Sequence, residues 1–110
     1  MNIEGLWIVD FAGIQGPPFR GGVVLVNRRI LGADDVHTYE GHYQLEGNKF
    51  NAKVTVRQYR EGFNVMKRNR PFEIELSGKV VKRDEISASG TVVGDAESEL
   101  VVVMKKRVDY

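Results

Sequence analysis

The amino-acid sequence predicts an all-β fold, an eight-stranded antiparallel barrel whose strands follow one another in up-and-down hairpin order. Apolar and polar residues alternate with a period of two through most of the chain, as they do in strands with one buried face. Turn-forming residues recur at short intervals, and no stretch keeps a helical period. Eight hairpin-connected strands are enough to close a small barrel.

The length of 110 residues suits one domain spanning residues 1–110. The composition, 42% hydrophobic and 28% charged, is typical of a soluble globular protein. The net charge of +1 gives no general attraction to nucleic acid or to anionic membranes. The chain has no cysteine, which excludes disulfides and thiolate chemistry. No leader or membrane-spanning run is visible, so we expect a cytoplasmic protein.

The first expected strand, Ile3–Phe11, contains the only tryptophan and carries apolar side chains on both faces. An early strand of this kind pairs with both the second strand and the last, and this double pairing closes a barrel. Residues 12–18 include two glycines and two prolines, which do not suit a central strand, so we expect a loop there. The second strand, Gly21–Val26, is again apolar on both sides.

A short connection separates the third and fourth expected strands. Arg29–Gly32 follows a turn at residues 27–28, and residues 33–35 form a loop because short aspartate side chains satisfy nearby backbone amides. The fourth strand, His37–Leu45, has one face that carries Tyr39, Gly41, Tyr43 and Leu45.

The remaining expected strands alternate clearly. Lys49–Arg60 is the longest, and Gly47 in the hairpin before it is free to adopt a positive φ angle. Residues 61–70 break the pattern and form a long connection. The last three strands are expected at Phe72–Val81, Glu85–Val92 and Leu100–Met104.

The inward faces of these strands form the predicted barrel interior. Small residues on them allow the sheet to coil strongly and also leave room for an internal cavity, although tight packing is the expected result. If a cavity is present, a ligand would contact the large inward side chains, namely Trp7, Tyr39, Tyr43, Phe50, Val54, Val56, Phe72, Leu76 and Met104.

The first, second and last strands also carry apolar side chains on the face that points outward. Leu6, Ile8, Val101 and Val103 would be costly in contact with water. We therefore expect this surface to be covered, either by a loop or by a second copy of the chain in a homodimer.

Histidine and carboxylate residues come together only around the fourth strand. Asp34, Asp35, His37 and His42 are candidate metal ligands, but the odd spacing of the two histidines directs them to opposite strand faces. The sequence thus disfavours a metal site and predicts a solvated turn with an exposed histidine. No serine lies in a nucleophile elbow and no phosphate loop precedes a helix, so no catalytic residue or cofactor is predicted.

A basic cluster within residues 61–70 is the strongest sign of a nucleic-acid site. Aromatic stacking combined with phosphate neutralisation is the chemistry of such sites. The near-zero net charge and the lack of a second aromatic platform disfavour this function, so we predict a mobile loop instead. Its candidate residues are Phe63, Met66, Lys67, Arg68 and Arg70.

The triplet Gly5-Leu6-Trp7 is similar to the Gly-x-Trp sequence that opens the first strand of lipocalin-like barrels. In those barrels the tryptophan packs across the closed end against an arginine late in the chain. The resemblance implies the same role for Trp7, with Arg107 as its cation–π partner.

The first half of the chain also resembles the GrlR family, lipocalin-like β-barrels that include a negative regulator of type III secretion. The similar segments are Gly5–Trp7, Gly21–Val24, Arg29–Asp34 and Tyr39–Tyr43. The resemblance implies a homodimer with an apolar cavity and a regulatory role toward a protein partner. The regulator's partner-binding hairpin carries alternating acids, whereas Leu45-Glu46-Gly47-Asn48 has one, so those binding residues do not carry over.

The sequence therefore favours a non-enzymatic regulatory or partner-binding barrel. The alternative is a carrier of a small apolar ligand, which requires a cavity of roughly 300 Å3 or more. An enzyme and a nucleic-acid-binding protein are less favoured.

Overall fold

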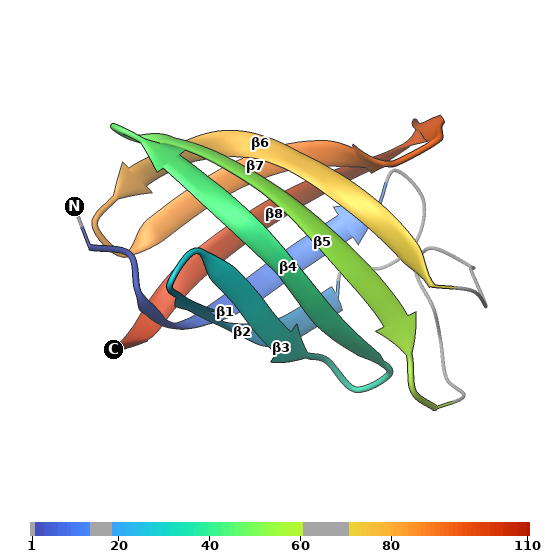
Figure 1. Cartoon of the computed structure of the whole chain (residues 1–110), viewed down its shortest axis with the longest axis horizontal. Coiled ribbons are helices and arrows are strands. Elements are labelled where there is room, and N and C mark those ends of the chain that lie inside the picture. The colour runs from blue at the N-terminus through green and yellow to red at the C-terminus, as the bar shows by residue number, and fades with distance from the viewer. Residues whose placement is uncertain (1, 14–18, 61–70) are drawn as a thin grey trace.

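The computed structural model describes residues 2–13, 19–60 and 71–110, which form eight antiparallel strands closed into a barrel (Figure 1). Each strand pairs with the next, and β1 pairs with β8 to close the sheet. The strands are β1 (Gly5–Gly13), β2 (Phe19–Val26), β3 (Arg29–Ala33), β4 (His37–Glu46), β5 (Lys49–Gln58), β6 (Phe72–Lys82), β7 (Glu85–Val92) and β8 (Asp95–Asp109). The predicted fold class is confirmed.

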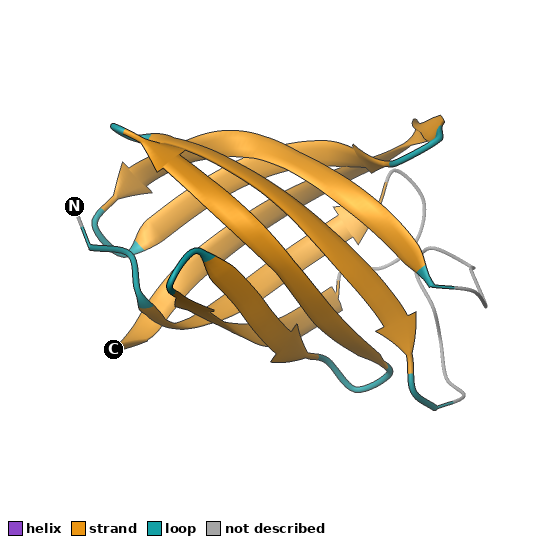
Figure 2. Ribbon diagram, in the orientation of Figure 1, coloured by secondary structure: helices purple, strands orange, loops and turns teal. Residues whose placement is uncertain are grey.

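Figure 2 shows only strands and loops in the described part of the chain. Within that part, no helix is long and apolar enough to cross a membrane.

Several predicted strand boundaries were wrong, and in three strands non-local pairing decides the outcome. β8 extends far beyond the predicted Leu100–Met104 because it pairs with β7 on one side and with β1 on the other. Ala12 and Gly13, expected in a loop, belong to β1 because they pair with Val101 and Leu100. β5 ends at Gln58, since the two residues that follow it bind the β3–β4 connection instead.

The period-two alternation determines which side chains enter the core. In β4, every second residue from His37 to Tyr43 is buried, and the residues between them are exposed. Close inward packing also requires small residues: a Cβ on Gly78 would lie 2.5 Å from Cα of Ala88 on β7. The predicted inward faces of β4 to β7 are therefore confirmed.

The two ends of the barrel differ in what crosses them. The chain termini lie together at one end, at the left in Figure 1, where the β2–β3, β4–β5 and β6–β7 hairpins also turn. The β3–β4 connection lies at the opposite end. We call these the Trp7 end and the His37 end, after the buried side chain at each.

Candidate functional site

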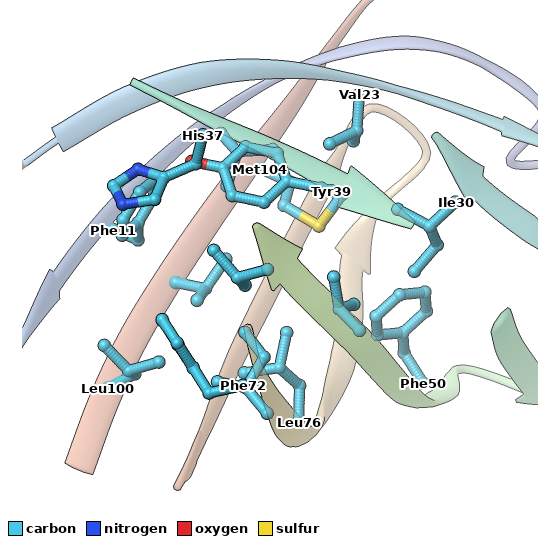
Figure 3. A pocket seen from close by; sticks show the side chains of 15 residues that line it. Phe11, Val23, Ile30, His37, Tyr39, Phe50, Phe72, Leu76, Leu100 and Met104 are labelled. Carbon is cyan, nitrogen blue, oxygen red and sulfur yellow. The ribbon is translucent and has the colours of Figure 1, made fainter. Parts of the chain in front are cut away.

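An apolar cavity of about 70 Å3 lies inside the barrel. In Figure 3, His37 and Phe11 lie at one end of it, and Ile30 and Phe50 lie at the other. Its wall is formed by Val9, Phe11, Val23, Ile30, His37, Tyr39, Phe50, Val54, Val56, Phe72, Ile74, Leu76, Leu100, Val102 and Met104.

The structure places most of the predicted interior residues in this wall. Trp7 and Tyr43 are buried in the core but do not line the cavity. Tyr43 instead stacks on Phe50, with 5.7 Å between ring centroids. The predicted residues that do line the cavity are Tyr39, Phe50, Val54, Val56, Phe72, Leu76 and Met104.

Sequence reasoning missed several lining residues. Three of them are at inward positions of β1 and β2, namely Val9, Phe11 and Val23. Because these strands carry apolar residues on both faces, the sequence alone did not indicate which face points inward. His37 was missed because a histidine beside two aspartates is typical of a solvated turn. That interpretation was wrong, since His37 is only 3% exposed.

At the Trp7 end, the tryptophan side chain is fully buried. Its Nε1–H donates a hydrogen bond to the carbonyl oxygen of Ile3, 2.8 Å away, which ties the N-terminal segment across this end. The Nζ atom of Lys106 lies 5.8 Å from the centroid of the Trp7 ring. This distance is within the range of a cation–π contact.

The predicted partner Arg107 was wrong, and a β-bulge explains why. Leu6 pairs with Val108, whereas Trp7 pairs with Lys106. Arg107 is therefore the extra residue of the bulge, and its side chain is exposed. The motif correctly implied a cation beside Trp7, but that cation is Lys106, the residue before Arg107.

At the His37 end, the Asp34 carboxylate accepts several buried hydrogen bonds. Its Oδ1 accepts from the backbone amides of Val36 and His37, at 2.7 and 2.6 Å. Its Oδ2 accepts from the hydroxyl of Tyr39. The Nδ1 atom of His37 lies 3.2 Å from both carboxylate oxygens. We call Asp34, His37 and Tyr39 the Asp34 cluster.

These contacts determine how the Asp34 cluster ionises. Burial by itself raises the pKa of the Asp34 carboxyl, but the hydrogen bonds from Tyr39, the two amides and the His37 ring outweigh it and hold the pKa below its ordinary value. Burial, followed by the hydrogen bond to Asp34, raises the pKa of Tyr39 far above its ordinary value. Asp34 is therefore the ionised member of the cluster and Tyr39 the neutral donor.

Local sequence and neighbouring strands together build the Asp34 cluster. The Asp34 amide donates to the carbonyl oxygen of His37, 2.9 Å away, and this bond closes the turn between β3 and β4. The hydroxyl of Tyr59 donates to the Asp34 carbonyl oxygen at 2.9 Å. Gly21 on β2 leaves the necessary room, because a Cβ there would lie 3.2 Å from both Cβ of Asp34 and Cε2 of Tyr39.

One polar atom of the Asp34 cluster has no partner. Nε2 of His37 is buried and forms no hydrogen bond with the described residues. The same ring forms part of the cavity wall, next to Phe11 (Figure 3). A buried nitrogen without a partner is unusual, because most buried polar atoms in proteins are hydrogen-bonded.

The other polar candidates do not converge on a site. His42 lies on the outer face of β4, so the predicted opposite orientation of the two histidines is confirmed. Among the described residues no group of three metal-ligating side chains comes together. The predicted mobile-loop residues Phe63, Met66, Lys67, Arg68 and Arg70 lie outside the described residues.

The outer face of the barrel carries a row of apolar side chains across four adjacent strands. Val108 pairs with Leu6, Leu6 with Val24, and Val24 with Leu31. Leu6, Leu31 and Val108 are 37, 40 and 55% exposed. Ile8, two residues from Leu6, points to the same side, and we call these five residues the outer apolar surface. Of the other predicted outward residues, Val101 is exposed and Val103 partly buried.

Comparison with family models and with curated proteins finds no match to this chain. Among solved structures, a redesigned β-barrel is similar, with a TM-score of 0.70 and 13% sequence identity. The likeness covers 96% of this chain and 91% of the redesigned barrel. At this level of identity it supports the barrel fold alone.

Proposed function

We propose that this chain is a non-enzymatic binding protein that forms a homodimer through its outer apolar surface. The observation that carries this proposal is the row of directly paired apolar side chains running from Val108 to Leu31. Isolated apolar residues on a surface are common, but a contiguous group costs free energy in water that an apolar partner surface recovers.

The charges beside the outer apolar surface favour a second copy as the partner. Lys105 lies on β8 opposite Ile8 on β1, at one edge of the row. Glu40 lies on β4 opposite Leu31, at the other edge, where its carboxylate also forms an exposed ion pair with Arg29 at 3.3 Å. A two-fold axis parallel to the strands brings the Lys105 edge of one copy over the Glu40 edge of the other. The same surface is then complementary to itself, as an isologous dimer requires.

We also propose that the dimer regulates another protein, and this role rests on the resemblance of the first half of the chain to the GrlR family. A regulator of that kind acts by binding another protein. A dimer has two copies of every surface that lies outside its own interface, and these surfaces are available to that second protein. The hairpin at residues 45–48, with its one acidic residue, is not assigned as the contact for that second protein.

The alternative role as a carrier depends on the volume of the barrel interior. The cavity of about 70 Å3 is well below the roughly 300 Å3 at which ligand pockets of ordinary size begin. The side chains of the core occupy most of the interior, which favours the binding of partners on the outside over the transport of a large ligand within.

The oligomeric state of two matched variants tests this proposal. Leu31→Glu places a charge in the outer apolar surface, and Val81→Glu places the same charge on an exposed valine of β6. We expect wild type and Val81→Glu to sediment as dimers and Leu31→Glu as a monomer, with unchanged circular dichroism for all three. A wild-type protein that is monomeric at about 100 μM, an ample concentration for interfaces of standard size, contradicts the proposal.

A further inference from the structure

Several basic side chains at the Trp7 end have no carboxylate partner within residues 2–13, 19–60 and 71–110. All of them are exposed, and they come from the turns and strand ends that surround this end of the barrel (Figure 1). We call them the basic rim, and its members are Arg28, Lys49, Lys79, Arg83 and Arg107.

The carboxylates near the basic rim neutralise little of its charge. Three of them already bind other groups at this end, namely Glu4, Glu85 and Asp109. In the described part of the chain, Glu46 and Asp84 are the carboxylates of this end that have no such contact. The Trp7 end therefore carries an excess of positive charge, although the net charge of the chain is only +1.

Arg28 has a backbone conformation that arginine rarely adopts. It is the second residue of the turn between β2 and β3, and its φ of 64° lies in the left-handed region, where glycine is the usual residue of such a turn. Backbone outliers of this kind lower stability and are found mainly where the protein uses the side chain. The exposed and unpaired guanidinium of Arg28 is therefore a candidate contact for an anion.

Lys49 and Lys79 are also placed unfavourably. They lie directly opposite each other on β5 and β6, and both are exposed. Like charges in directly opposite positions destabilise a sheet. Lys53, on the same face of β5, lies instead 3.5 Å from a carboxylate oxygen of Glu75. A carboxylate bound at Lys49 and Lys79 would relieve their repulsion in the same way.

Arg83 and Arg107 line a groove of about 410 Å3 between the β6–β7 turn and the last residues of β8. A guanidinium group binds a carboxylate through two parallel hydrogen bonds, a geometry that lysine does not offer. The groove has room for the side chain of a glutamate or an aspartate between the two arginines.

We propose that the basic rim binds an acidic segment of a protein partner, whose carboxylates pair with the lysines and arginines of the rim. This inference rests on the proposed binding of a second protein and names the chemistry of that protein's contact. Glu46 lies opposite Lys49, and Asp84 lines the groove. These interspersed acids favour a partner with separate carboxylates over the continuous charge of a nucleic-acid backbone or an anionic membrane.

The proposed dimer would present two basic rims to the same partner. A two-fold axis parallel to the strands keeps the strand direction of both copies, so both Trp7 ends lie at one end of the dimer. One acidic segment that reaches both rims then binds more tightly than a segment that reaches one.

A peptide of about twelve residues with alternating glutamate and serine is the probe, and the same peptide with glutamine in place of glutamate is its control. Exposed ion pairs are individually weak, so we expect a dissociation constant of about 0.1–1 mM at about 50 mM salt and at least about five-fold weaker binding at about 200 mM. In 1H–15N NMR spectra, the backbone amides of the basic rim should shift, whereas those of Asp34 and Tyr39 at the other end should not. The control peptide should shift neither set.

Two substitutions separate binding from folding, because each removes a cation together with an unfavourable feature. Arg28→Gly and Lys79→Gln should each weaken peptide binding about two- to five-fold. Their midpoints of thermal unfolding should equal or exceed that of wild type. Lys53→Gln is the matched control, since Lys53 is already paired with Glu75, and it should bind the peptide as wild type does.

Sedimentation of the same samples keeps this proposal separate from the dimer. Peptide binding by a monomeric protein would contradict the dimer alone. A dimer whose basic rim shows no shift with the peptide would contradict the acidic partner alone.

Three further results would overturn the proposal. One is a set of shifts centred on the chain's other basic cluster, Lys67, Arg68 and Arg70, instead of the basic rim. Another is tighter binding, at the same salt concentration, of a single-stranded thymidine oligonucleotide or of phosphatidylserine vesicles than of the peptide. The third is a lowered unfolding midpoint for both Arg28→Gly and Lys79→Gln with unchanged peptide binding, which would assign these cations to folding.

Discussion

The two ends of the barrel are closed by different chemistry. At the Trp7 end, a large aromatic ring is fully buried, with a lysine over its face and one hydrogen bond to the chain that crosses it. At the His37 end, a buried carboxylate binds two backbone amides, a tyrosine and a histidine. The first end depends on apolar burial, and the second depends on the charge of one aspartate. The two ends should therefore respond differently to side-chain truncation and to pH.

Among the variants that distinguish the two ends, Trp7→Ala should lower the free energy of unfolding the most. Removing a fully buried aromatic side chain lowers the free energy of unfolding by about 3–5 kcal/mol, because the cavity left behind is only partly filled by relaxation. Urea denaturation at neutral pH measures the change. A loss below about 1 kcal/mol would mean that Trp7 does not close the barrel.

Asp34→Asn should lower the free energy of unfolding by a smaller amount, and this amount should depend on pH. The lowered pKa of Asp34 means that the folded state favours the carboxylate. Its contribution is fully present above the unfolded pKa of about 4 and is lost as the pH falls through the lowered folded-state value. We therefore expect the variant to be about 2–3 kcal/mol less stable than wild type at pH 7, from the loss of hydrogen bonds to a charged group.

The pH profile separates this effect from simple damage to the turn. The stability difference between wild type and Asp34→Asn should shrink as urea denaturation is repeated from pH 7 down to about pH 3. The difference between wild type and Trp7→Ala should stay nearly constant over the same range. A gap for Asp34→Asn that does not change with pH would show that the charge of Asp34 contributes nothing.

Lys106→Met and Arg107→Met should have the smallest effects and serve as a matched pair. Lys106 lies over the Trp7 ring, whereas Arg107 is the exposed residue of the bulge. The Lys106 side chain is only 7% exposed, and its Nζ also donates to Asp109 and to the carbonyl oxygen of Asn2. A cation–π contact contributes about 0.5–1 kcal/mol at an exposed site and about 2 kcal/mol when desolvated, so we expect a loss of about 1–2 kcal/mol for Lys106→Met and almost none for Arg107→Met. Thermal unfolding of both variants measures the difference, and the reverse order would restore Arg107 as the partner.

Much of the fold follows from local pattern. The alternation of Tyr39, Gly41 and Tyr43 with their polar neighbours predicted the inward face of β4 correctly. Gly47 has the expected positive φ of 59° in its hairpin. Such features can be predicted from the sequence because alternation and turn formation involve only residues that are close in the chain.

The candidate site was harder to predict because it depends on contacts between distant residues. Nothing in the residues around Asp34 shows that Tyr59, 25 positions later, binds its carbonyl oxygen, or that Gly21 leaves space beside it. The same neighbourhood therefore suggested a solvated turn, although it forms a buried cluster. The cavity volume could not be predicted from sequence either, since it depends on how inward side chains from seven of the eight strands pack together.

Local pattern was enough to predict an all-β barrel of eight strands and the inward residues of β4 to β7, because period-two alternation and turn residues act over a few positions. The place of Trp7 at a closed end came instead from the resemblance of Gly5-Leu6-Trp7 to lipocalin-like barrels. The contact of Lys106 rather than Arg107 with Trp7, and the burial of His37 against Asp34, required the tertiary structure. Barrel closure sets the register of β8 against β1, and a one-residue bulge in that register changes which side chain meets Trp7.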